Sequence, residues 1–68
     1  MKAVEVRENT NVGLRYAFRE GGGIFVQGVT KDPHRDPWLR TRMTRWDVDE
    51  MRRRSKQVDL SPELPGGR

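Results

Sequence analysis

The chain has no cysteine and a single histidine among its 68 residues. Without cysteine it has no disulfides, no thiolate catalysis and no cysteine-ligated zinc site. No apolar run approaches the roughly 20 residues of a membrane span, and Glu5 lies where a signal peptide needs its apolar core. We therefore expect a cytoplasmic protein that does not enter a membrane.

Apolar residues are also scarce, at 32% against 35% charged residues. A chain this short seldom gains more than about 3 to 5 kcal/mol from a single core, so we expect one domain at most. The apolar residues cluster in alternating blocks, which favours a folded middle. Because the segment after Asp59 lacks periodicity and is rich in proline and glycine, we predict a domain over residues 1–56 and a flexible, disordered tail over 57–68.

Residues that carry catalysis are few. His34 lies in a polar, proline-containing stretch with no cysteine to pair with, so we interpret it as a loop residue. Asp47, Asp49 and Glu50 fall within one helical turn, but the helix dipole already favours acids there. The glycines at 21–23 lack the lysine and the spacing of a phosphate-binding loop. We predict that the protein is not an enzyme and binds no metal and no cofactor.

Four stretches alternate between apolar and polar residues, which is the pattern of half-buried strands. They are residues 2–8, 14–20, 24–30 and 38–43. In the second stretch Leu14, Tyr16 and Phe18 share one face, and Arg15 and Arg19 share its reverse. We expect the apolar face to line the core and the arginine face to meet solvent.

Glycines 21–23 separate the second and third stretches and predict an antiparallel hairpin, because glycine tolerates the positive φ of tight turns. The third stretch is apolar on both faces. Either Ile24 and Val26 or Phe25 and Val29 point inward, and we favour Ile24 with Val26.

A helix start is encoded in Thr44-x-x-Asp47. The Thr44 hydroxyl can accept the amide hydrogen of residue 47 while the Asp47 carboxylate accepts that of residue 44, a capping box. We predict a helix from Arg45 to about Lys56. Trp46 lies about 140 to 160° around this helix from its inward apolar residues, so it either covers one side or is exposed. The fold class is therefore α+β: a small antiparallel sheet of three or four strands covered by one C-terminal helix.

The formal net charge of +4 is concentrated in the second half, where nine basic residues stand against six acidic ones from Arg35 onward. Most of the basic residues are arginine, which suits phosphate. If the helix covers the apolar sheet face, the arginines on the reverse share a solvated face with one aromatic. The predicted nucleic-acid contacts are Arg15, Arg19, Trp38, Arg40 and Arg42 on that face, with Arg45, Arg52, Arg53 and Arg54 as supporting phosphate contacts. Duplex DNA is favoured, because an arginine-bearing ribbon fits the major groove, although a tryptophan there suits an unpaired base.

The pattern resembles the AP2-like, arm-type DNA-binding domains of phage integrases, in which a three-stranded sheet is followed by a helix. The matching stretches are Leu14–Glu20, Gly21–Gly23, Ile24–Thr30 and Arg40–Thr44, leading into Asp47–Met51. The resemblance implies DNA contacts from the sheet face. This chain departs from the family by an added first strand and by a proline-containing loop at residues 31–37 in place of a tight turn.

Two other interpretations fit the same residues. Glu5, Glu8 and Glu20 can pair with the arginines across strands, leaving an ordinary charged exterior. The chain can also be a phage or mobile-element factor that docks on a host protein and modulates it, because arginine and tryptophan are typical of interface hot spots. A homodimer through an edge strand is a further possibility. Salt dependence separates phosphate binding from a protein interface centred on tryptophan.

Overall fold

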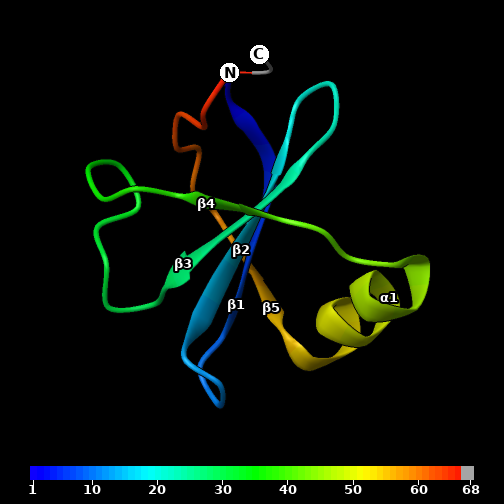
Figure 1. Ribbon diagram of the computed structural model, residues 1–68. Helices are drawn as coiled ribbons and strands as arrows, with labels where there is room; N and C mark the ends of the chain where they lie inside the picture. The colour runs from blue at the N-terminus through cyan, green and yellow to red at the C-terminus, as the bar shows by residue number, and fades with distance from the viewer. Residues whose placement is uncertain (67–68) are drawn as a thin grey trace.

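The sheet has five antiparallel strands in the order β4-β3-β2-β1-β5, so the two shortest strands form its edges. The computed structural model describes residues 1–66. The elements in chain order are β1 (Ala3–Asn9), β2 (Leu14–Arg19), β3 (Ile24–Gly28), β4 (Leu39–Thr41), α1 (Arg45–Arg54) and β5 (Lys56–Val58). The α+β class, the antiparallel sheet and the single helix are confirmed, with one strand more than the three or four predicted (Figure 1).

The hairpin between β2 and β3 forms as predicted. The two strands pair antiparallel with Ala17 opposite Phe25. Gly21, Gly22 and Gly23 in the turn have φ angles of 82°, 116° and 104°. Residues other than glycine are strained at such positive φ angles, so the three glycines set the position of the turn.

The two faces of the sheet are unequally covered. The face that bears Val6, Ala17 and Phe25, which we call the core face, is buried, and Phe25 is only 2% exposed. The face that bears Tyr16 and Val26, which we call the helix face, is half-buried. Figure 1 shows α1 on one side of the sheet, and the loop after β3 and the C-terminal segment on the other.

Two predictions about the sheet are therefore wrong. The half-buried side chains on the helix face include Leu14, Tyr16, Phe18, Ile24 and Val26. We expected all five to point into the core, and Phe25 lies there instead. The physical reason is coverage: one ten-residue helix shields the helix face only in part, whereas a long loop and the end of the chain pack over the core face.

The C-terminal segment closes the core face. β5 pairs antiparallel with β1, and Leu64 is 3% exposed within the core cluster. The backbone amide of Ala3 donates a hydrogen bond of 3.1 Å to the carbonyl of Pro62. Residues 57–66 thus complete β5 and form part of the core where a flexible tail was expected. The last two residues of that expected tail lie outside the described residues.

Helix α1 begins with the predicted capping box. The Asp47 amide donates to Thr44 Oγ1, and the Thr44 amide donates to Asp47 Oδ2, each at 3.1 Å. The helix leads from β4 at one edge of the sheet to β5 at the other. The Arg52 guanidinium carbon lies 4.8 Å from the centre of the Phe18 ring on the helix face. Within residues 1–66 no helix is long and apolar enough to cross a membrane.

Candidate nucleic-acid interface

Arg15 is a buried structural residue. It is 6% exposed, and its Nε donates to the Glu8 carboxylate and its Nη1 to Gln27 Oε1, both at 2.7 Å. Its other hydrogen bonds go to the backbone carbonyls of Lys31 and Val29, at 2.9 and 3.0 Å. These four contacts tie β2 to its neighbouring strands and to the loop after β3. The guanidinium is therefore occupied and shielded from any partner.

Arg19 and Trp38 are buried in the same way. Arg19 donates to the carbonyls of Gly22 and Pro65, each at 2.8 Å. The indole Nε1–H of Trp38 donates to the carbonyl of Pro33 at 2.9 Å. Both side chains thus serve to fasten loops and the C-terminal segment onto the core face.

The predicted solvated face carrying Arg15, Arg19 and Trp38 is therefore wrong. These side chains point to the core face, and segments distant in sequence cover them. The alternative in which glutamates neutralise the arginines holds for Arg15, which pairs with Glu8. Within residues 1–66 the sheet consequently has no solvated face formed by Arg15, Arg19 and Trp38.

An exposed basic segment runs from β4 into the first turn of α1. We call residues 39–46 the edge ribbon, because β4 is an edge strand. Its exposed side chains are Leu39, Arg40, Arg42, Thr44, Arg45 and Trp46. The ribbon contains no acidic residue, and none of its three arginines forms an ion pair within residues 1–66. Leu39 and Trp46 are 67% and 68% exposed. The ribbon thus combines three free guanidinium groups with two open apolar side chains.

The remaining predicted contacts lie at the end of α1 and are exposed but paired. Arg52 forms an ion pair of 3.0 Å with Glu5. Arg53 and Arg54 both pair with Glu50, one turn earlier on the helix. The carboxylates of Glu5 and Glu50 are half-buried, but the three guanidinium groups are exposed, and each has five N–H donors, of which the ion pair uses only part. These three arginines can therefore support phosphate binding but carry less free charge than the edge ribbon.

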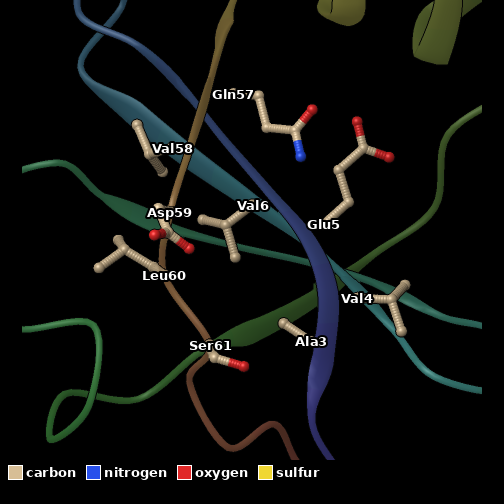
Figure 2. Close-up of a pocket in the computed structure, with 9 residues that line it drawn as sticks. All are labelled: Ala3, Val4, Glu5, Val6, Gln57, Val58, Asp59, Leu60 and Ser61. Atoms are coloured by element: carbon tan, nitrogen blue, oxygen red, sulfur yellow. The ribbon is translucent and has the colours of Figure 1, made fainter.

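A hollow of about 570 Å³ lies between β1 and the segment 57–61, where the chain moves away from β1 beyond their short pairing (Figure 2). Val4, Val58 and Leu60 give it apolar walls, and Glu5 and Asp59 are the charged residues that line it. Its lining contains no basic residue, so it does not extend the basic surface. Asp59 opposes phosphate there, whereas the Glu5 carboxylate is paired with Arg7 and Arg52.

His34 lies exposed in the loop after β3, where its backbone amide donates to Asp32 Oδ1 at 2.8 Å. In the part of the chain that the structure describes, no group of three or more histidine or acidic residues is arranged to hold a metal ion. Comparisons with protein-family models, curated proteins and solved structures find no match. The resemblance to AP2-like arm-type domains therefore stays a prediction.

Trp46 is the ribbon residue that the sequence left open, as either a lateral cover or an exposed side chain. The structure decides for exposure. The signal was its angular separation from Val48 and Met51, of which Met51 is buried. An aromatic residue on the polar side of a short helix, next to an arginine, was the sequence feature that indicated the edge ribbon.

Proposed function

We propose that this chain is a non-enzymatic, cytoplasmic protein that binds nucleic acid through the edge ribbon. The observation that carries the proposal is the cluster of Arg40, Arg42 and Arg45, three exposed and unpaired guanidinium groups within six residues that contain no acid. Arginine presents a planar fork of donors that matches the oxygens of a phosphate. Arg53 and Arg54 extend the same positive field at the far end of α1.

The net charge of +4 supports this proposal, because a positive field raises the rate of encounter with a polyanion. Three phosphate contacts predict that log Kd changes with log salt with a slope of magnitude about 2.7 on duplex DNA, or about 2.1 on a single strand. Binding that rests on the ribbon should therefore be modest at physiological salt and much tighter at low salt.

The test is fluorescence anisotropy of labelled oligonucleotides with the full chain at two salt concentrations. The double variant Arg40→Ala/Arg42→Ala should weaken binding about tenfold or more, because hydrogen bonds to charged groups are among the stronger polar contacts. It should also lower the magnitude of the salt slope by about 1.4 to 1.8. Thermal unfolding should be almost unchanged, since both side chains are exposed.

A matched control removes the same amount of charge elsewhere. Arg35→Ala/Lys56→Ala deletes two exposed basic residues outside the ribbon, so it should alter the affinity far less than the ribbon variant. Equal losses in both doubles would mean that net charge, and not the ribbon, drives the binding. An unchanged affinity in the ribbon double would remove the edge ribbon as the binding surface.

A second candidate function is docking on a host protein and modulating the activity of that protein. The exposure of Leu39 and Trp46 favours it, because tryptophan and arginine are enriched in interface hot spots. Pairing of two β4 edges in a homodimer would bring like-charged arginines together, so the partner that suits this edge is acidic. Binding centred on Trp46 would depend less on salt than binding to nucleic acid.

A further inference from the structure

The edge ribbon and α1 lack the features of elements that read duplex DNA in the major groove. Such readers insert a helix or a two-stranded ribbon that carries basic side chains. Arg40 is the only basic residue of β4, and the residue paired with it on β3 is the buried Phe25. The first turns of α1 carry Asp47 and Asp49, which repel phosphate, and Glu50, which is paired with Arg53 and Arg54. Neither the sheet edge nor the helix therefore offers a continuous basic reading element.

Trp46 is the feature that groove binding leaves unexplained. This indole is 68% exposed on the first turn of α1, whereas the other tryptophan, Trp38, is 6% exposed. Arg45 is its neighbour in the helix, and Arg42 lies four residues before it. An open aromatic ring that is close in sequence to unpaired, exposed arginines is the combination that binds single strands, because every base presents a face for stacking while the cations hold the backbone.

We infer that the ligand of the edge ribbon is single-stranded nucleic acid, with one base stacked on Trp46 and the backbone held by Arg40, Arg42 and Arg45. This inference rests on the proposed function. The path from residue 40 to residue 46 is at most about 22 Å long, since an extended chain spans about 3.3 to 3.6 Å per residue. A surface of that length accommodates a short site, near the lower end of the roughly 4 to 16 nucleotides that one small single-strand-binding fold covers. Stacking of this kind tolerates any base, so sequence selectivity should be weak.

The two tryptophans supply the measurement. Trp38 is buried and hydrogen-bonded to Pro33, so a change in intrinsic fluorescence on adding ligand reports mainly on Trp46. Oligothymidylate should quench the emission of the full chain in a saturable way at low salt. A duplex of equal length should bind more weakly and quench less.

Two substitutions at position 46 separate stacking from simple apolar contact. Trp46→Leu keeps an apolar side chain but removes the ring, and should weaken oligothymidylate binding about 5- to 150-fold, the range expected for loss of one base stack. Trp46→Phe keeps a smaller ring and should recover part of the loss. Both variants should fold, because the side chain is largely exposed, and circular dichroism checks this directly.

The outcomes distinguish the inference from the proposal beneath it. If duplex binds as tightly as the single strand, or if Trp46→Leu binds oligothymidylate normally in an anisotropy assay, the stacking inference is overturned. The proposed function would then still stand, provided that the Arg40→Ala/Arg42→Ala variant loses affinity. If neither form of nucleic acid binds at low salt, both the inference and the proposed function fail.

Discussion

Replacing Arg15 with alanine should severely destabilise this protein. The substitution deletes hydrogen bonds to Glu8, Gln27, Val29 and Lys31 and leaves their oxygens without a donor beneath the loop that follows β3. Removal of one member of a buried ion pair costs about 3 to 5 kcal/mol. The Glu8 side chain is 24% exposed, so water can solvate its carboxylate in part. We therefore expect about 3 kcal/mol, at the lower end of that range.

A loss of that size approaches the whole stability of a domain this small, which is about 3 to 5 kcal/mol from its core. In domains of 60 to 100 residues each kcal/mol lowers Tm by roughly 4 to 8 °C, so Arg15→Ala should melt roughly 12 to 24 °C below the parent chain. The assay is thermal and urea denaturation followed by far-UV circular dichroism. Arg15→Lys should give an intermediate result, because an ammonium keeps the charge but cannot reach four acceptors at once.

Arg40→Ala is the matched control, since Arg40 is also an arginine on a strand of the sheet but is exposed and unpaired. Its free energy of unfolding should stay within about 0.5 kcal/mol of the parent. If Arg15→Ala melts within a few degrees of Arg40→Ala, the buried hydrogen-bond network is not what the structure indicates. If Arg15→Ala stays folded but loses nucleic-acid affinity, Arg15 contacts the ligand at the surface and is not a buried structural residue.

Two further predictions concern the C-terminal segment. Leu64→Ala should lower the free energy of unfolding by about 2 to 5 kcal/mol, because Leu64 is 3% exposed in the core. Val12→Ala, at a 60% exposed position, should have little effect in the same melts. Equal melting of the two variants would mean that residues 57–66 do not complete the core. The hydrogen bond from the Met1 α-ammonium, 2.8 Å from the Glu63 carboxylate, lowers the pKa of Glu63. Its ionised form is therefore favoured in the folded state, and the small stabilisation it gives is present near neutral pH and lost as the pH falls through the lowered pKa. Melts of the parent chain and Glu63→Gln should differ slightly at pH 7 and converge in acid; a difference that grows in acid would contradict the pairing.

Local features of the fold were readable from the sequence because each depends on residues close together in the chain. The Thr44 and Asp47 capping box joins positions three apart. Three successive glycines supply the positive φ angles of the hairpin without help from elsewhere. The free charge of the edge ribbon was also visible, since no acid lies between residues 39 and 46.

The inward face of the sheet could not be read in the same way. Alternation in β2 places Tyr16 on one face and Arg15 on the other, and hydrophobicity alone assigns the aromatic residue to the core. The opposite outcome arises because Arg15 finds acceptors 7 to 16 residues away and Arg19 finds one 46 residues away. Whether burial of a charged group is tolerated depends on such partners, since an unpaired buried charge is very costly. The chain thus determined by itself where β1 to β4, the glycine turn and the helix form, whereas β5 depends on its pairing with β1. Only the tertiary structure decided which arginines became part of the core and which were left free to bind, because it brought the loop and the C-terminal segment over one face.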